Sequence, residues 1–553
     1  MAVVLGVNAV FHDPAAALLV DGRIVAAAEE ERFSRRKHGK EPVPFSTWEL
    51  PIEAARWCLR QAGLDPSDVD VVSYSYEPKL VPPPDSPGLD PGWEHLRTLY
   101  ASRAPGFLAT ALPRLDPAKV EFVPHHVAHA ASAHLAAPFA DSAVLVLDGR
   151  GEAASHLGGH SRRGDLEVLA AQQLPDSLGL LYEEVTEHLG FRRSSDEYKV
   201  MALASYGDPT RFASAFRRHV VPTEDGGFRT RDLRPAELTA PRAPGGLLQP
   251  EHADLAAALQ ERLEEMVLSL ACWLHSRTGE RAITMAGGVA LNCVANARLA
   301  REGPYEQVWV QPAAGDAGTA LGGALHVAHR AGDHCVPMDS AALGRAWSEE
   351  AIEDTLLDAA VPFERPERLA DEVAEALAAN AVVGWFQGRS EYGPRALGHR
   401  SLLVDPSRVD NLQRMNAIKG REEFRPVAPI VLLERASEVF DGVVPSPYML
   451  FVHRVRPEWR DRIAAAVHVD GTARAQTVDR RDEPLLAGLL DAFAARTGTP
   501  VLVNTSFNTA GRPIVDSPKD ALECFGSGPI DLLVLGPFVV RRSGLAVGAT
   551  RAA

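Results

Sequence analysis

Short apolar runs separated by polar turns open the chain, and their lengths are typical of β-strands. The first three such runs are residues 3–8, 15–20 and 24–29. A similar succession returns at residues 143–149, 153–158 and 166–171. Each set begins with an apolar strand that ends in a polar tip, and helical segments follow it. This repeat predicts a duplicated α/β domain of the actin-like (ASKHA) type, with a nucleotide bound between its halves.

The periodic pattern loosens at residues 336–350 and resumes beyond them, which predicts a linker between two domains. Four later apolar runs predict strands at residues 381–386, 427–433, 501–504 and 532–535. Segments 368–379 and 483–497 have the spacing of amphipathic helices. We therefore expect an N-terminal domain over residues 1–335 and a second α/β domain over residues 351–553.

Composition narrows the class of protein. With 46% hydrophobic and 24% charged residues, the 553-residue chain has a globular composition, and no apolar run reaches the roughly 20 residues of a membrane-spanning helix. The N-terminus lacks the pattern of a signal peptide, so we expect a cytoplasmic protein with no membrane partner. A formal net charge of −16 disfavours a nucleic-acid partner and leaves small molecules as the expected ligands. Five scattered cysteines argue against a disulfide framework and a thiolate zinc site.

Two histidines four residues apart, His125 and His129, begin an alanine-rich segment that favours helix. This spacing puts both side chains on one helix face, within reach of a shared metal ion. An isolated pair of this kind is more often incidental, because a site needs further ligands. Asp148, at the tip of a strand, and Asp316, before a predicted helix, are the candidates. Two imidazoles with two carboxylates suit iron(II), manganese or zinc.

Two further segments carry candidate residues for proton transfer and for nucleotide binding. His12 follows the first strand, where a neutral imidazole can take a proton from an attacking hydroxyl, although His12 alone is more simply interpreted as a turn residue. Gly287 and Gly288 follow a predicted strand and precede a helix start near Asn292. Because glycine lets the backbone approach a ligand closely, this segment is a candidate nucleotide contact.

The second domain contains a candidate anion site. Lys419 and Arg421 alternate along the chain, as do Ser506 and Asn508 at the end of a predicted strand. Each pair projects to one side if its segment is extended. Lysine and arginine with neutral donors form a suitable set for phosphate oxygens and a neighbouring carbonyl oxygen. For any single basic residue, a solvated surface charge is the simpler interpretation.

Several motifs together resemble the NodU/CmcH-type carbamoyltransferase family. They are residues 11–19, 29–38, 125–133, 393–398, 424–426 and 504–508, in this order along nearly the whole chain. Within the family the chain most resembles the branch that includes the tobramycin carbamoyltransferase. One departure is the turn before Lys199, where relatives often carry a glycine.

The resemblance implies a TsaD-like N-terminal domain and a YrdC-like C-terminal domain. It implies that His125, His129, Asp148 and Asp316 bind a metal, with iron(II) favoured, and that His12 is the catalytic histidine beside the acceptor. Gly287, Gly288 and Asn292 match nucleotide contacts. The YrdC-like active-site pattern falls on Lys419, Arg421, Ser506 and Asn508, with Arg395 and Arg474 in neighbouring motifs.

The family also implies the reaction. Carbamoyl phosphate and ATP, with Mg²⁺, would give carbamoyl-adenylate, whose carbamoyl group passes to a hydroxyl of a small molecule such as an antibiotic or another secondary metabolite. Two alternatives remain open from the sequence: a TsaD-like enzyme that modifies tRNA, and a nucleotide-binding regulator without chemistry. The sequence leaves a homodimer open.

Overall fold

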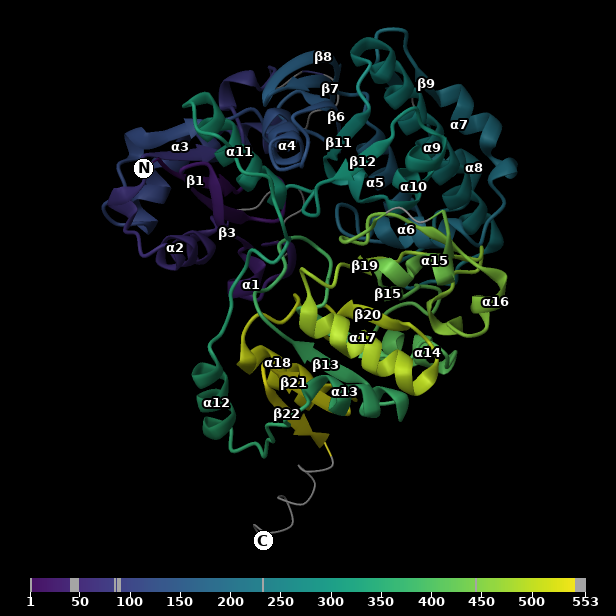
Figure 1. The fold of residues 1–553 in the computed structure, drawn as a ribbon. Coiled ribbons are helices and arrows are strands. Elements are labelled where there is room, and N and C mark those ends of the chain that lie inside the picture. The colour runs from purple at the N-terminus through teal and green to yellow at the C-terminus, as the bar shows by residue number, and fades with distance from the viewer. Residues whose placement is uncertain are drawn as a thin grey trace. The chain divides into compact units, whose positions relative to one another are not determined.

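The computed structural model describes residues 2–39, 49–83, 86, 91–230, 233–442 and 445–542 (Figure 1). They form two compact units, Met1–Ser340 and Ala341–Ala553. Both units combine sheets with helices, so the mixed α/β class predicted from the sequence is confirmed. None of the helices in these ranges combines the length and the apolar composition needed to cross a bilayer.

The first unit contains two five-stranded sheets. The strands of the first are β1 (Val3–Asn8), β2 (Ala15–Val20), β3 (Arg23–Glu29), β4 (Val71–Tyr74) and β5 (Val120–Phe122). Their order is β3-β2-β1-β4-β5, in which β2 is antiparallel to both β1 and β3, and β4 and β5 are parallel to β1.

The second sheet repeats this plan. Its strands are β6 (Asp141–Leu147), β7 (Ala154–Arg162), β8 (Asp165–Gln173), β11 (Ala282–Ala286) and β12 (Gln307–Val310). The order β12-β11-β6-β7-β8 again places an antiparallel meander on one side of the first strand and two parallel strands on the other. The predicted duplication is therefore confirmed.

Two helices lie between these sheets: α4 (His125–His134) and α11 (Ala317–Arg330) (Figure 1). Helix α11 packs on β1 and on α4, and α4 packs on β6 and β11. A Cβ atom on Gly6 would meet the carbonyl oxygen of Ala320 at 1.9 Å, and one on Gly322 would meet that of Ala128 at 1.8 Å. Glycine at these two positions lets the backbones approach closely and so sets the spacing of the helices.

The other α-helices of the first unit pack on the sheets or on one another. They are α1 (Glu31–Ser34), α2 (Ile52–Gln61), α3 (Pro91–Ala111), α5 (Leu178–His188), α6 (Glu197–Ala204), α7 (Ala213–His219), α8 (Pro235–Leu238), α9 (Pro250–Thr278) and α10 (Cys293–Glu302). A small hairpin joins β9 (Val220–Pro222) and β10 (Phe228–Thr230). Helix α2 shows the general rule, because its apolar face packs on β2 and β3 while its polar face stays exposed.

The second unit is built on a seven-stranded mixed sheet of order β19-β15-β20-β14-β13-β21-β22. Its strands are β13 (Val383–Phe386), β14 (Arg400–Val404), β15 (Ala428–Leu432), β19 (Gln476–Val478), β20 (Val501–Ser506), β21 (Leu532–Leu535) and β22 (Phe538–Arg541). The four strands predicted for this region are confirmed as β13, β15, β20 and β21. A smaller sheet joins β16 (Phe440–Asp441), β17 (His453–Val455) and β18 (Thr472–Ala473).

Helices cover both faces of the large sheet. They are α12 (Glu349–Asp358), α13 (Leu369–Ala378), α14 (Asp410–Ile418), α15 (Ala436–Val439), α16 (Pro457–Arg460), α17 (Pro484–Thr497) and α18 (Pro518–Ser527). Helices α13 and α17, both predicted, lie side by side and share a core with Leu502 of β20 (Figure 1). Val503, the next residue, belongs to the core that α14 and α18 cover. Alternate side chains of β20 thus pack into two cores on opposite faces of the sheet.

Candidate functional sites

The four residues of the predicted metal site, His125, His129, Asp148 and Asp316, come together in the first unit. One ligand atom from each lies within 4.8 Å of the others, and all four residues are buried. The histidines lie on α4, Asp148 follows β6, and Asp316 stands directly before α11. The packing of α4 against β6 and α11 therefore assembles the cluster.

The His125 ring presents one nitrogen to both carboxylates. Its Nδ1 lies 3.2 Å from the carbonyl oxygen of Ser75, to which it donates, so Nε2 faces the cluster. Nε2 is 3.5 Å from Asp148 Oδ2 and 3.6 Å from Asp316 Oδ1. Both distances exceed those of good hydrogen bonds, and this nitrogen has no hydrogen-bond partner within the described residues.

His129 and Asp316 complete the cluster in the same way. His129 Nε2 lies 3.6 Å from Asp316 Oδ1, and neither ring nitrogen of His129 is hydrogen-bonded within the described part of the chain. Asp316 occupies the N-cap position of α11, yet its side chain makes no capping hydrogen bond. Buried polar atoms without partners are costly, and a divalent cation that accepts nitrogen and oxygen ligands would satisfy them. The residues therefore fit a metal ion.

The histidines and carboxylates of the cluster shift one another's pKa values. Burial opposes the charged form of His125, but Asp148 and Asp316 outweigh it and raise the His125 pKa well above its usual value. Burial also opposes the ionised form of Asp148, but His125 and His126 hold the pKa of that carboxyl well below its usual range. The carboxylates thus attract positive charge strongly, and a metal ion can supply it in place of a proton.

The glycine segment predicted to contact a nucleotide lies directly against Asp148. The N–H of Gly288 donates to Asp148 Oδ1 over 3.0 Å. Gly287 has φ of 91°, and a Cβ there would meet the carbonyl oxygen of Leu147 at 2.2 Å. Only glycine combines this left-handed backbone with such a close approach. Gly288 therefore holds the carboxylate through its N–H group, and Gly287 allows the close approach to the backbone of Leu147; the sequence did not reveal this role.

Two residues next to the cluster, Glu152 and His126, were not predicted from the sequence. Glu152 Oε1 accepts from the N–H groups of His125 (2.9 Å) and Glu77 (2.8 Å), and thereby fixes the first turn of α4. His126 is buried, and its Nε2 lies 3.7 Å from Asp148 Oδ2. All three contacts join residues more than twenty positions apart, so only the fold reveals them.

His12 lies beside the cluster. Its Nε2 is 3.8 Å from Asp316 Oδ2, and its Nδ1 lies 2.9 Å from Asp13 Oδ2. Asp13 Oδ1 is in turn 2.8 Å from His38 Nδ1. With Nδ1–H donating to Asp13, His12 presents Nε2 toward the cluster, which is the orientation a general base needs.

Asn292 and Lys199 have partners within the protein. Asn292 Oδ1 accepts from the N–H of Ala295 over 3.0 Å and caps α10, while Asn292 Nδ2 donates to Gln260 Oε1 over 2.8 Å. Its side chain therefore first serves to fix the start of α10. Lys199, in the first turn of α6, has its Nζ 3.0 Å from Asp196 Oδ2.

In the second unit, Lys419 lies against the pair Ser506 and Asn508, 87 and 89 positions away along the chain. Lys419 Nζ donates to the carbonyl oxygen of Ser506 over 2.6 Å, to Ser506 Oγ over 2.9 Å, and to Asn508 Oδ1. Ser506 Oγ also lies 2.9 Å from Asn508 Oδ1. The end of α14 and the end of β20 thus assemble a positive charge and neutral polar groups at one place.

Arg421 and Arg395 sit on segments that are held in shape. Arg421 Nε donates to Asn416 Oδ1, and Asn416 Nδ2 in turn bonds two nearby backbone carbonyls. The loop that carries Arg395 is closed by the buried carboxylate of Glu391, whose Oε1 accepts from three backbone N–H groups, of Leu397 (2.7 Å), His399 (3.0 Å) and Arg400 (3.1 Å).

A pair of buried amides joins three of the candidate segments. Asn504 of β20 donates to Gln476 Oε1 over 2.7 Å and to the carbonyl oxygen of Ala396 over 3.2 Å. Ala396 follows Arg395, and Gln476 comes two residues after Arg474. This network therefore connects the backbone segments of both arginines to the strand that leads to Ser506.

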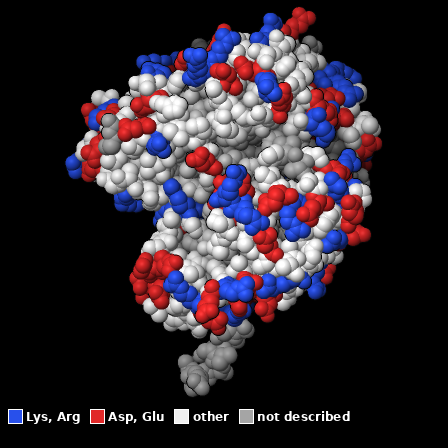
Figure 2. Space-filling model, in the orientation of Figure 1, with Lys and Arg blue, Asp and Glu red and all other residues white. Residues whose placement is uncertain are grey.

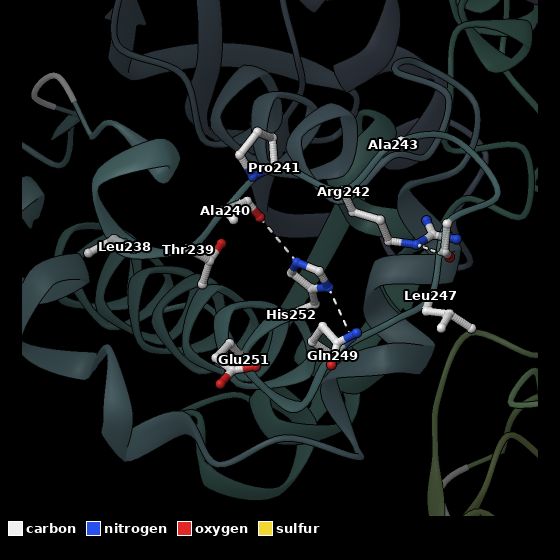
Figure 3. A pocket seen from close by; sticks show the side chains of 11 residues that line it. Leu238, Thr239, Ala240, Pro241, Arg242, Ala243, Leu247, Gln249, Glu251 and His252 are labelled. Carbon is white, nitrogen blue, oxygen red and sulfur yellow. Dashed lines mark hydrogen bonds between the residues drawn. The ribbon is translucent and has the colours of Figure 1, made fainter.

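A pocket of about 580 Å³ in the first unit is lined by residues 238–243, 246, 247, 249, 251 and 252, none of which the sequence marked (Figure 3). His252, at its wall, is used internally: its Nδ1 accepts from the N–H of Gln249 over 3.0 Å and its Nε2 lies 3.1 Å from the carbonyl oxygen of Ala240. No pair of acids, bases or metal ligands converges among these lining residues, so the clusters above are the better candidates.

Charges of both signs are interspersed on the face drawn in Figure 2. Lys and Arg side chains alternate there with Asp and Glu over both units, so this face presents no broad basic area among its described residues.

Family comparison identifies the class. Residues 3–81 and 107–325 match the description "Carbamoyltransferase N-terminus", and residues 374–542 match "Carbamoyltransferase C-terminus". The chain belongs to the carbamoyltransferase family and is a transferase. The resemblance noted from the motifs is thereby confirmed, and the alternative of a regulator without chemistry is not supported.

Curated relatives extend over most of the chain. Nodulation protein NolNO of Sinorhizobium fredii (strain NBRC 101917 / NGR234) is 39% identical over 97% of this chain and 80% of its own length. The 3'-hydroxymethylcephem-O-carbamoyltransferase of Amycolatopsis lactamdurans is 36% identical over 64% of this chain and 67% of its own. Among solved structures, component A of (R)-2-hydroxyglutaryl-CoA dehydratase from Acidaminococcus fermentans aligns with 60% of this chain and 100% of its own, at 14% identity and a TM-score of 0.34. A similarity of that size supports no further conclusion.

Proposed function

We propose that this enzyme is an ATP-dependent O-carbamoyltransferase that works in two steps. Residues 351–553, as a YrdC-like domain, make carbamoyl-adenylate from carbamoyl phosphate and ATP. Residues 1–335, as a TsaD-like domain of the actin-like type, transfer the carbamoyl group to a hydroxyl. The observation that carries the proposal is the contact of Lys419 with Ser506 and Asn508, because it joins a cation to neutral polar groups suited to phosphate and carbamoyl oxygens.

In the first step, water cleaves the bond between the carbamoyl carbon and the phosphate oxygen, which yields carbamate and inorganic phosphate. A carbamate oxygen then bonds to the α-phosphorus of ATP, and the bond to the β-phosphate oxygen breaks to release pyrophosphate. Arg395, Lys419, Arg421 and Arg474 neutralise the phosphate oxygens, and Mg²⁺ accompanies the ATP.

In the second step, the acceptor oxygen forms a bond to the carbamoyl carbon, and the bond from that carbon to AMP breaks. His12 Nε2 takes the hydroxyl proton, an assignment supported by the Asp13 contact at Nδ1. Gly287, Gly288 and Asn292 are the proposed nucleotide contacts. A divalent metal held by His125, His129, Asp148 and Asp316, iron(II) first with manganese or zinc as alternatives, would supply positive charge beside the carbonyl and phosphate oxygens.

The acceptor is proposed to be a hydroxylated small molecule such as an antibiotic or another secondary metabolite. The Amycolatopsis relative is named a 3'-hydroxymethylcephem-O-carbamoyltransferase, and this name supports an oxygen atom as the acceptor. Retention of tRNA by the protein on a filter would instead favour the alternative of a tRNA-modifying enzyme, which the net charge of −16 disfavours.

The proposal is tested by pyrophosphate release from ATP with and without carbamoyl phosphate, in the absence of any acceptor. We expect release that depends on carbamoyl phosphate. Release at the same rate without it would contradict the adenylation step, and so would its complete absence.

A further inference from the structure

Asn504 is a buried residue of β20 that the reaction outlined above does not use. It is 1% exposed and pairs with Leu403 of β14 on one side and Ala428 of β15 on the other. Because side chains alternate along a strand, Asn504 and Ser506 project from the same face of the sheet. Asn504 therefore lies one side-chain position deeper than the serine that contacts Lys419.

The orientation of the Asn504 amide follows from its neighbours. Gln476 Nε2 donates to the carbonyl oxygen of Leu397 over 2.7 Å, which directs Gln476 Oε1 toward Asn504. Asn504 Nδ2 then faces two acceptors, Gln476 Oε1 at 2.7 Å and the carbonyl oxygen of Ala396 at 3.2 Å. The opposite orientation would set oxygen against oxygen at both contacts, so the assignment of Nδ2 and Oδ1 is fixed by the carbonyls.

This orientation leaves Asn504 Oδ1 as a buried acceptor. It has no donor within the described residues, although the other half of the same amide is fully engaged. A buried acceptor of this kind calls for an N–H or O–H donor, which a ligand or a water molecule can supply. The neighbouring side chain on the same face, Ser506, already belongs to the proposed anion site, so the ligand is one that carries an anion at one end and a donor at the other.

We propose that Asn504 Oδ1 accepts a hydrogen bond from the amino group of the carbamoyl moiety, and that this contact makes the site select carbamoyl phosphate over acyl phosphates. Carbamoyl phosphate has N–H donors next to its carbonyl, whereas acetyl phosphate has a methyl group there. Acetyl phosphate would leave the buried oxygen unpaired, and a site built to bond an N–H group rejects an analogue that lacks it. The inference rests on the proposed function, since it assigns the carbamoyl end of the same substrate.

The test compares binding of carbamoyl phosphate, acetyl phosphate and inorganic phosphate to the full-length chain by calorimetry. We expect the wild type to bind carbamoyl phosphate at least about tenfold more tightly than acetyl phosphate. Asn504→Ala should bring this ratio close to one and leave the affinity for inorganic phosphate unchanged. Ser506→Ala should weaken all three ligands and preserve the ratio.

Gln476→Ala is the matched control, because it removes one of the two acceptors of Asn504 Nδ2, while the carbonyl oxygen of Ala396 still orients the amide and Asn504 Oδ1 stays in the protein. It should keep the preference for carbamoyl phosphate, which a merely structural role of Asn504 would not predict. Equal wild-type affinity for the two acyl compounds, or an unchanged ratio in Asn504→Ala, would overturn the inference and leave the proposed function standing. A wild type that binds neither carbamoyl phosphate nor inorganic phosphate would overturn both. If Asn504→Ala fails to fold, equal wild-type affinity for carbamoyl phosphate and acetyl phosphate still overturns the inference.

Discussion

The backbone N–H of Gly288 donates to Asp148 Oδ1 over 3.0 Å, which leaves Asp148 Oδ2 as the oxygen that faces the histidines of α4. Oδ2 lies 3.5 Å from His125 Nε2 and 3.8 Å from His129 Nε2. A carboxylate held by one oxygen is preorganised to bind with the other. The glycine segment after β11 and the histidines of α4 therefore approach different oxygens of the same carboxylate.

Asp148→Asn should lower the metal affinity of the protein at least about tenfold. Asparagine can keep the hydrogen bond from Gly288 through its oxygen. It then presents its NH₂ group to His125, and an amide NH₂ group cannot bind a metal. Metal content after dialysis against a metal buffer measures the effect. Asp165→Asn, at an exposed position of β8, is the control and should keep the metal. Equal metal content in the two variants would contradict the site.

Gly322→Ala should destabilise the first unit by about 1–3 kcal/mol and also reduce metal binding. The new Cβ would lie 1.8 Å from the carbonyl oxygen of Ala128, so α11 must move away from α4, which carries His125 and His129. Thermal unfolding and metal content test this. Gly106→Ala in α3 is the matched change, because nothing lies within 4 Å of its Cβ, and it should leave stability unchanged or higher. Similar effects of the two changes would contradict the packing argument.

Stability should depend on pH through Glu30, which accepts from the N–H groups of Glu53 (3.2 Å) and Ala54 (2.8 Å) at the start of α2. Burial raises the pKa of Glu30 from its usual 4.5 to about 7. Between these values the folded protein keeps a proton that the unfolded chain has lost. The free energy of unfolding should therefore fall as the pH rises through this window, by roughly 3 kcal/mol in all.

Urea unfolding at pH 5 and pH 8 measures this contribution. Glu30→Gln stays neutral throughout, so it should show a smaller decline than the wild type. Glu167→Gln, at an exposed position of β8, should decline as the wild type does. A decline in Glu30→Gln as large as that of the wild type would exclude Glu30 as its source.

Much of the fold could be predicted because the strands are short apolar runs with clear boundaries, such as residues 501–504 within β20. The members of the candidate metal site were likewise recognisable, because the helical spacing of His125 and His129 and the strand-end position of Asp148 are local signals. The contacts that hold these residues in place could not be predicted from the sequence. The approach of Gly322 to Ala128 depends on how two distant helices pack, which no local pattern encodes.

The same limit applied in the second unit. Ser506 and Asn508 could be selected from their alternation at the end of a strand. Asn504 belongs to the same alternation, but it looks like any buried strand residue until the carbonyls of Leu397 and Ala396 fix the direction of the amides. The role proposed for it follows from hydrogen bonds between distant segments, one of which joins Asn504 to Ala396, 108 positions away.

The central claim is that adenylation and transfer use different residues of one chain. Pyrophosphate release that depends on carbamoyl phosphate, measured without acceptor for Lys419→Ala and His12→Ala side by side, tests it most directly, with Lys519→Ala at an exposed position of α18 as the control. The account predicts that Lys419→Ala abolishes release, whereas His12→Ala and Lys519→Ala release pyrophosphate as the wild type does. Loss of release in His12→Ala as complete as in Lys419→Ala would contradict the division into two steps.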